Sequence, residues 1–204
     1  MCTCYYLQPE TERLKGINNR ISHSSLYDKY IRAGDAVLTS GEIKPGNVVP
    51  VIAPNRKGEI SVFPMRWGFG SPGMILLANA RLESIRETEV FKDSWKSHRC
   101  IVPASWFYEW KQDPEGFGQK TDKNKYMVQP MGEMETWLCG LYRFEGGFPV
   151  FSVITGKAKR GIKKINDRMP IMMPKNLIKE WIRPEAKPDE LLGYALTEMI
   201  IEKA

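Results

Sequence analysis

The chain has 204 residues, of which 42% are hydrophobic and 11% aromatic, and its formal net charge is +6. This composition excludes a disordered chain, and the length allows one domain with a sizeable core. No apolar run reaches the roughly 20 residues that span a bilayer. The start lacks the basic and apolar regions of a signal peptide, so we expect a cytoplasmic protein without a membrane partner. The positive excess suits a polyanionic partner as well as a merely solvated basic surface.

The four cysteines do not form a recognisable framework. In a reducing cytoplasm we expect free thiols rather than disulfides. A zinc site formed by all four is the alternative, but the chain has no C-x-x-C pair and C-x-C is poor ligand spacing. We therefore expect neither a metal nor an organic cofactor. The positions are Cys2, Cys4, Cys100 and Cys139.

The first half of the chain predicts helices around a hairpin. Leu14, Ile17 and Ile21 recur at helical spacing and predict a first helix within residues 9–21. Residues 48–54 and 59–69 are rich in β-formers and flank the sequence NRKG, which predicts a hairpin. A capping box at Ser84 to Glu87 predicts a helix through about Lys96. Its inward residues are expected to be Ile85, Phe91 and Trp95.

The second half predicts a series of strands. Residues 99–110 favour a strand, a turn and then a strand or short helix, and residues 112–124 a polar loop. The segments KYMVQP, ETWLCGLYRF and PVFSVITG follow as strands, with a turn at the GG of 146–147. A helix near 175–183 and a last helix or strand complete the chain. We expect one α+β domain over residues 1–204, with a curled, barrel-like, mostly antiparallel sheet and a few flanking helices.

Several separated segments carry a family resemblance. They are Met1-Cys2, MRWGF (65–69), NARLES (79–84), RCIVPASWFYEW (99–110), FSVITGKA (151–158) and INDRMPIMM (165–173). In this order they resemble the SOS response-associated peptidase (SRAP) family over nearly the whole chain. The resemblance implies the SRAP fold and a covalent thiazolidine crosslink between an N-terminal cysteine and an abasic site in single-stranded DNA. It also implies self-removal of Met1, and hence peptidase and lyase-like activity in the DNA damage response.

The residues explain why Cys2 suits this chemistry. Once Met1 is gone, Cys2 carries a free α-amine beside its thiol, and such an amine has a pKa near 7.7–8.0. The amine can form an imine with an aldehyde, and the thiol can then close a five-membered ring. An internal cysteine has only an amide nitrogen, and a lysine has no thiol. The alternative interpretation is that a cysteine stands at position 2 by accident.

Three further residues are catalytic candidates by the same resemblance. Glu109 lies between aromatic residues that would raise its pKa, so it could shuttle protons during imine formation; the alternative is an ordinary surface glutamate. Asn79 could hold a sugar hydroxyl, or serve only as a turn residue. Asn166 stands where the family usually has histidine, and it cannot exchange protons near neutral pH. We expect ring formation to survive this change, and Met1 removal or crosslink reversal to suffer more.

The start also departs from the family's usual Cys-Gly-Arg, because Thr3 and Cys4 follow Cys2. This change removes a small residue and a positive charge beside the nucleophile. Cys4 is a second reactive thiol, a redox partner or a buried apolar residue, and we favour the last.

Recognition of DNA that lacks a base has to rely on phosphates and stacking. Arg81 suits a phosphate, although an ion pair with Glu83 is the alternative. Trp67 and Trp106 could stack on flanking bases, with core packing an equal alternative for each. The DNA-binding candidates are Arg66, Trp67, Arg81, Trp106, Thr155, Lys157 and Arg168. A basic run adds Lys159, Arg160, Lys163 and Lys164.

Two other functions compete with the crosslinking enzyme. One is a non-catalytic nucleic-acid-binding module in which Asn166 and Cys4 mark lost chemistry. The other is an amidase with an N-terminal cysteine nucleophile. We expect a monomer that meets abasic single-stranded DNA in a bacterial cytoplasm, associated with the nucleoid when bound.

Overall fold

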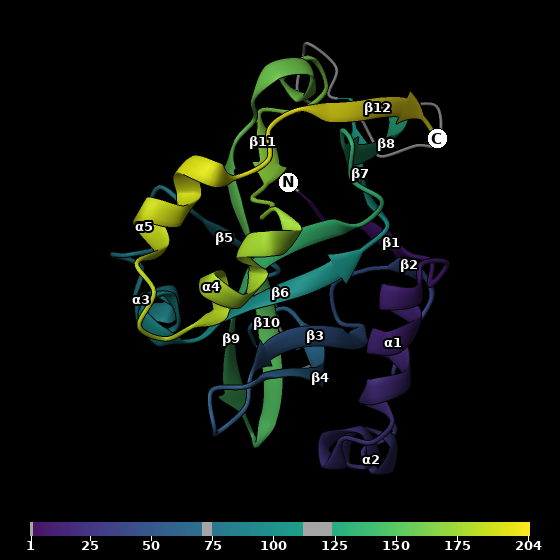
Figure 1. Cartoon of the computed structure of the whole chain (residues 1–204), viewed down its shortest axis with the longest axis vertical. Coiled ribbons are helices and arrows are strands. Elements are labelled where there is room, and N and C mark those ends of the chain that lie inside the picture. Colours follow the sequence, from purple (N-terminus) through teal and green to yellow (C-terminus); the bar gives the residue numbers. More distant parts are fainter. Residues whose placement is uncertain (1, 71–74, 112–123) are drawn as a thin grey trace.

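Five strands pair in a closed ring in the computed structural model, which describes residues 2–70, 75–111 and 124–204 (Figure 1). The ring closes because β10 pairs with both β4 and β9. The β10–β4 pairing is parallel and the other four are antiparallel. In ring order the strands are β10 (Phe148–Lys157), β4 (Ile60–Trp67), β3 (Val48–Pro54), β6 (Arg99–Ala104) and β9 (Thr136–Glu145).

Two short strands extend this barrel along β10. The strand β5 (Asn79–Arg81) runs parallel to β10, and β11 (Arg168–Pro170) runs antiparallel to it. Thr155 on β10 is in register with both Arg81 and Pro170. This end of β10 therefore brings NARLES and INDRMP together, although the two segments are far apart in the chain.

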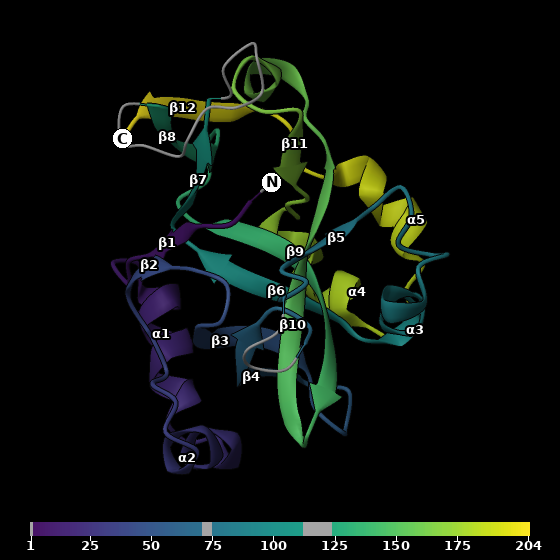
Figure 2. The same cartoon turned by 180° about the vertical axis from the view of Figure 1, so that it is seen from behind.

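A second, five-stranded sheet is entirely antiparallel. Only Ser105 separates β6 from the first residue of β7, so one continuous segment links the barrel to this sheet. Figure 2 shows the sheet from behind, with the N-terminus beside β7 and β11 in the view. The strand order is β12 (Met199–Lys203), β8 (Lys125–Pro130), β7 (Trp106–Trp110), β1 (Tyr5–Leu7) and β2 (Gly41–Ile43).

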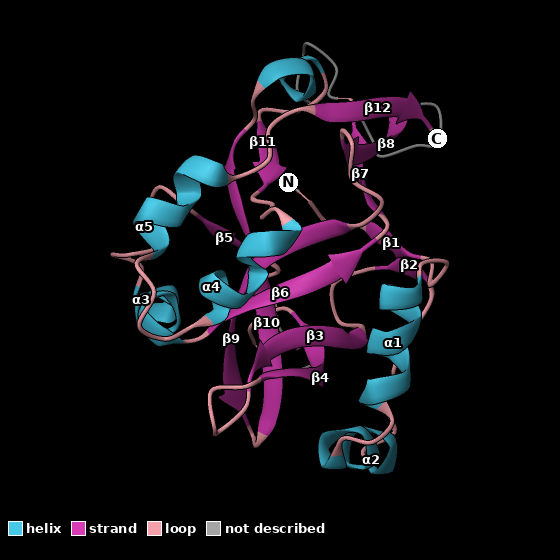
Figure 3. Ribbon diagram, in the orientation of Figure 1, coloured by secondary structure: helices cyan, strands magenta, loops and turns pink. Residues whose placement is uncertain are grey.

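The helices lie around the outside of the strands (Figure 3). None of the helices in the described ranges is long and apolar enough to cross a membrane. The α-helices are α1 (Glu12–Ile21), α2 (Ser25–Arg32), α3 (Glu89–Ser97), α4 (Ile178–Ile182) and α5 (Pro188–Leu191). Short 3-10 helices are η2 (Arg160–Lys164), η3 (Lys175–Leu177) and η4 (Leu192–Tyr194).

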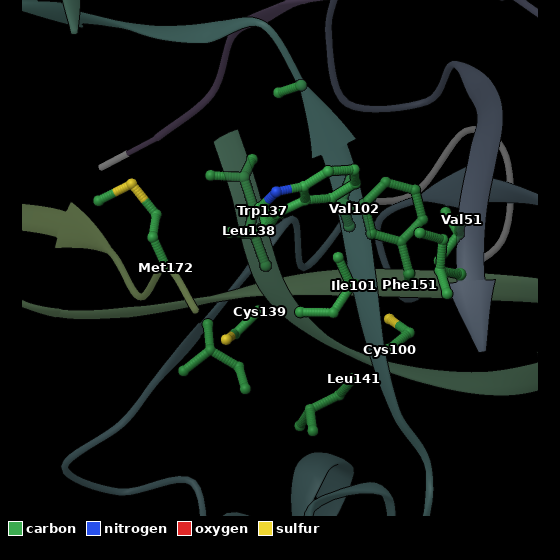
Figure 4. Close-up of a cluster of buried hydrophobic side chains, with 14 of the residues drawn as sticks. Val51, Cys100, Ile101, Val102, Trp137, Leu138, Cys139, Leu141, Phe151 and Met172 are labelled. Atoms are coloured by element: carbon green, nitrogen blue, oxygen red, sulfur yellow. The ribbon is translucent and has the colours of Figure 1, made fainter. Parts of the chain in front are cut away.

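The barrel strands enclose the core. Figure 4 shows Ile101, Leu141 and Phe151 in one buried cluster with the thiols of Cys100 and Cys139. The packing is close enough to require a glycine at position 140, since an added Cβ there would lie 2.9 Å from Cys100 Sγ. Burial in this apolar environment raises the pKa of both thiols, so they act as core residues.

The predicted α+β fold with a barrel-like sheet is confirmed, and so are the first helix, the hairpin and the GG turn. The capping box was wrong, because α3 begins at Glu89 after Thr88 and residues 82–87 form turns instead. Its expected inward residues are nevertheless buried. The helix α2 was not predicted, and residues 112–123 of the predicted loop lie outside the described residues.

Candidate active site

The N-terminal segment leads Cys2 into the core beside β5. The side chain of Cys2 is 0% exposed. Asn79, at the start of β5, donates a hydrogen bond from Nδ2 to the carbonyl oxygen of Cys2 at 2.8 Å. Because 77 residues separate the two in sequence, this bond ties the chain terminus to the NARLES segment.

Glu109 is the charged group of this site. It lies on β7 among inward-facing residues and is 1% exposed. Asn166 donates from Nδ2 to Glu109 Oε2 at 3.0 Å, and the backbone N–H of Arg168 donates to Asn166 Oδ1 at 3.1 Å. A backbone N–H can only donate, so it fixes the orientation of the Asn166 amide and directs the NH₂ group toward the carboxylate. Asn166 therefore positions Glu109.

Burial raises the pKa of the Cys2 thiol far above its usual range, and the negative charge of Glu109 raises it further. The thiol is therefore protonated at neutral pH. Any reaction of this cysteine in the buried state has to begin at another atom or through removal of this proton by a neighbouring base.

Asn79 also contributes an open hydrogen-bond acceptor. Its Oδ1 is buried and accepts no hydrogen bond from the described residues, while its Nδ2 is engaged with Cys2. A buried acceptor without a donor costs free energy, which a substrate hydroxyl or N–H could recover. The four residues expected to be catalytic thus lie in one connected group.

Comparison with known proteins identifies the family. A model described as SOS response associated peptidase (SRAP) matches residues 1–202. The chain belongs to this family. It is 30% identical over 184 residues to the abasic site processing protein YoaM of Bacillus subtilis, covering 79% of this chain and 77% of that protein. It is 28% identical over 155 residues to the abasic site processing protein YedK of Escherichia coli, covering 72% and 66%.

Solved structures share the SRAP chain's fold. A protein from Bacteroides thetaiotaomicron matches with a TM-score of 0.70 and 18% identity, covering 98% of this chain and 90% of that one. A phage-related protein from Bordetella bronchiseptica matches with a TM-score of 0.68 and 22% identity, covering 100% and 94%. At these identities the similarity concerns the fold alone.

Two residues expected to bind DNA are instead interior residues of this SRAP domain. Arg168 is 8% exposed and pairs with Glu83, Nη1 to Oε1 at 2.8 Å. Its Nη2 donates to the carbonyl and hydroxyl oxygens of Thr155, at 2.6 and 3.2 Å. Thr155 is itself fully buried. The sequence suggested Glu83 as a partner for Arg81, but in the structure Glu83 forms its ion pair with Arg168. Arg168 holds Asn166 through its backbone N–H and is itself held by Thr155, so these two residues support the position of Asn166.

Arg81 and Lys157 remain exposed beside the site. Along β5, Ala80 is buried while Asn79 and Arg81 are not, so Arg81 projects to the same side of the strand as Asn79. Lys157 lies in register with Arg168 at the end of β10. From there the basic run continues into η2, where Arg160 pairs with Glu198 at 3.2 Å. Arg81 and Lys157 are thus exposed cations beside the site.

The other three DNA candidates lie elsewhere. Trp67 is fully buried and donates from Nε1 to the Ala78 carbonyl at 2.8 Å, so it has no surface on which a base could stack. Arg66 pairs with Asp35 and lies over the Tyr30 ring, 5.7 Å from its centroid, beside α2. Trp106 alternates with the inward residues of β7 and faces the side of the strand opposite Glu109. Arg66 and Trp106 thus have partners away from the site, and Trp67 is part of the core that packs behind it.

The sequence did not reveal the surroundings of Cys4. Its side chain is buried, and burial raises its pKa to about 12, with a further contribution from the charge of Glu42. Glu42 is paired with Lys125 at 2.7 Å and with Lys44 at 2.8 Å. The hydrogen bonds from Lys125 and Lys44 lower the pKa of Glu42 to about 2. The thiol thus borders a charged cluster rather than a purely apolar pocket.

Proposed function

We propose that this chain, once Met1 is removed, forms a covalent thiazolidine crosslink through Cys2 with abasic sites in single-stranded DNA. The observation that carries the proposal is the hydrogen bond from Asn79 to the Cys2 carbonyl, in a group that also holds Glu109. The names of the curated relatives, abasic site processing proteins, support the same substrate.

The reaction follows from the groups on one residue. The free α-amine of Cys2 attacks the C1′ aldehyde of the ring-opened sugar and gives a carbinolamine. Loss of water then gives an imine. The thiol sulfur adds to the imine carbon while its proton passes to the nitrogen, which closes the five-membered ring. No oxidant or cofactor is needed, and one water leaves for each crosslink.

The neighbouring residues supply proton transfer and orientation. Glu109 takes a proton from the attacking amine and returns one to the departing hydroxyl. Asn166 holds the carboxylate in place at 3.0 Å. Asn79 holds the Cys2 backbone, and its open Oδ1 accepts a hydrogen bond from the sugar or the amine. Arg81 and Lys157 bind flanking phosphates and supply affinity that does not depend on sequence.

Access sets one condition for this mechanism. The Cys2 side chain is 0% exposed, so the N-terminal segment has to shift before the aldehyde can reach the amine and the thiol. Removal of Met1 is the natural trigger, because it shortens this segment and moves the free α-amine to Cys2. In the same proposal the chain removes Met1 itself. Glu109 takes the thiol proton, the Cys2 sulfur attacks the Met1 carbonyl carbon and the Cys2 nitrogen leaves as the free amine, and water then hydrolyses the thioester and releases methionine.

A single experiment tests the proposal. Protein whose intact mass shows that Met1 is absent is mixed with a single-stranded oligonucleotide carrying one abasic site, and the products are separated under denaturing conditions. We expect a slow-migrating covalent band that is absent with Cys2→Ala and with an intact oligonucleotide. Lack of the band with correctly processed, folded protein would refute the proposal.

The second candidate function is a non-catalytic nucleic-acid-binding module, and the observation that favours it is Asn166 in place of a proton-carrying histidine. It predicts salt-sensitive binding of the same oligonucleotide without a covalent band. Peptide-amide turnover that abasic DNA does not affect would instead indicate a general amidase.

A further inference from the structure

A cavity of about 800 Å³ lies apart from the proposed site, between the start of α1, the β6–β7 corner and the β8–β9 turn. Charged residues of both signs line it, but negative charge prevails in a chain of net charge +6. Two cations, Arg13 and Lys175, line the cavity with four carboxylates, one of which, Glu12, is paired with Lys15 at 2.8 Å. These carboxylates belong to Glu10, Glu12, Glu133 and Glu135.

Glu135 distinguishes this cavity from a solvated acidic surface. The residue is 7% exposed, and none of the hydrogen bonds within the described residues reaches its carboxylate. Its one ion-pair partner in the described ranges is Arg13, whose Nη1 lies 3.8 Å from Oε2, too far for a good hydrogen bond. That Nη1 itself has no hydrogen-bond partner among the described residues. The Glu135 carboxylate lines the cavity and has acceptor capacity left for N–H donors from outside.

An aromatic wall faces the same cavity. Trp106 lines it and is stacked on Tyr6, with ring centroids 4.8 Å apart and planes 1° from parallel. The indole Nε1 of Trp106 is buried and makes no hydrogen bond within the described chain. A cation above an indole face is attracted by the ring quadrupole, and Trp is the best of the aromatic residues in this respect.

Exposed methionines extend the cavity outward. Met134 lines it and is 76% exposed, and Met131 in the same turn is 58% exposed. Methionine side chains adapt to different apolar partners, and exposed apolar groups rimmed by polar residues mark interaction sites. A small inorganic cation would leave these side chains unused, whereas a peptide would cover them.

We propose that this cavity docks a basic peptide segment of a partner protein, with one arginine or lysine in contact with Glu135 and Trp106 and an apolar neighbour on Met134. A DNA strand is the wrong ligand, because its phosphates would meet an excess of carboxylates. Trp106 and Glu109 lie on opposite faces of β7, so a docked peptide would leave the Cys2 site open.

The probe is an acetylated, amidated peptide of alternating arginine and leucine, titrated into the full-length chain by calorimetry and followed by the indole N–H signal of Trp106 in nitrogen-15 NMR. The signal is assigned with Trp106→Phe. We expect saturable binding with a shift of this signal. Glu135→Gln should weaken binding about tenfold through loss of a charged hydrogen bond. The matched control is Glu87→Gln, an exposed carboxylate outside the cavity, which should leave binding unchanged.

Several outcomes would overturn the inference. One is absence of saturable binding. Another is equal weakening by Glu87→Gln, which would mean general charge attraction. Equal affinity for spermine would indicate a polyamine site, and concentration-dependent dimers lost in Glu135→Gln would indicate a second copy of the chain. Crosslinking to abasic DNA should persist in Glu135→Gln, so this inference and the proposed function fail separately.

Discussion

Cys2 and Cys4 are two residues apart, yet the structure places them in different surroundings. Both thiols are buried, and for both burial is the main cause of a raised pKa, followed by a nearby carboxylate. For Cys2 that carboxylate is Glu109, which is 1% exposed and held by Asn166. For Cys4 it is Glu42, which is one-third exposed and paired with two lysines.

The difference shows what makes a cysteine suitable for the proposed reaction. A raised thiol pKa does not distinguish the two residues. The distinguishing features are the future α-amine, the Asn79 hydrogen bond and a buried carboxylate that the Asn166 amide orients. A carboxylate held by two lysines, as Glu42 is, makes a poor base, because its protonation would break those pairs.

The largest expected effect comes from replacing the two thiols one at a time. In Cys2→Ser prepared with Met1 removed by an aminopeptidase, the amine is kept but no thiazolidine can form, so we expect complete loss of the stable crosslink, with an imine that only borohydride traps. Cys4→Ala should give the wild-type yield. Denaturing gels with and without borohydride measure both. A stable crosslink in Cys2→Ser, or its loss in folded Cys4→Ala, would contradict the assignment.

The second-largest effect is expected from removing the buried carboxylate charge of Glu109. Glu109→Gln, likewise prepared without Met1, keeps the shape and the hydrogen-bonding capacity toward Asn166 but cannot carry the proton. We expect crosslink formation to slow by about 100-fold, the usual contribution of a positioned acid–base group. Single-turnover kinetics measure the rate, and thermal melting checks the fold. The control Glu202→Gln removes an exposed charge on β12 and should have no effect. Similar rates in all three proteins would exclude Glu109 from proton transfer.

A proton carrier can also be restored. Asn166→His introduces beside Glu109 an imidazole, whose ordinary pKa is near 6.5. We expect the crosslink to form at a similar rate but to reverse about tenfold faster, since general acid–base catalysis becomes available. The lifetime is measured by chasing preformed crosslink with unlabelled abasic DNA. Asn176→His, on the exposed η3, is the matched control. Equal lifetimes would show that position 166 does not limit reversal.

The smallest effect concerns stability at alkaline pH. The Cys4 pKa of about 12 exceeds that of an unfolded cysteine, near 8.5. The folded state therefore holds its proton more tightly, and the resulting stability is complete below about pH 8.5 and is lost as pH rises toward 12. At about pH 9.2 the loss should be near 1 kcal/mol for this thiol. Urea unfolding at neutral and alkaline pH should show a smaller decrease for Cys4→Ser. An equal decrease would mean that Cys4 titrates normally in the folded chain.

The sequence alone was sufficient for elements defined by local patterns. Helical spacing located α1, and alternating β-formers around NRKG located the β3–β4 hairpin. The capping box at Ser84 failed because its local hydrogen bonds serve turns in residues 82–87, and Thr88 precedes the helix instead. Competing local structures of similar energy cannot be ranked without the packing of Phe91 and Trp95 against the core.

For the candidate site, the sequence named the residues and the fold decided their surroundings. The family resemblance grouped Cys2, Asn79, Glu109 and Asn166. The short strands on β10 bring the Asn79 and Asn166 segments together, and hydrogen bonds connect them to Cys2 and to Glu109 on β7. The barrel and its added strands determined that Trp67 and Arg168 are buried, and the second sheet determined that Trp106 faces the acidic cavity. The physical reason is that a strand pattern specifies alternation between two faces, whereas sheet closure and partner strands determine which face is covered.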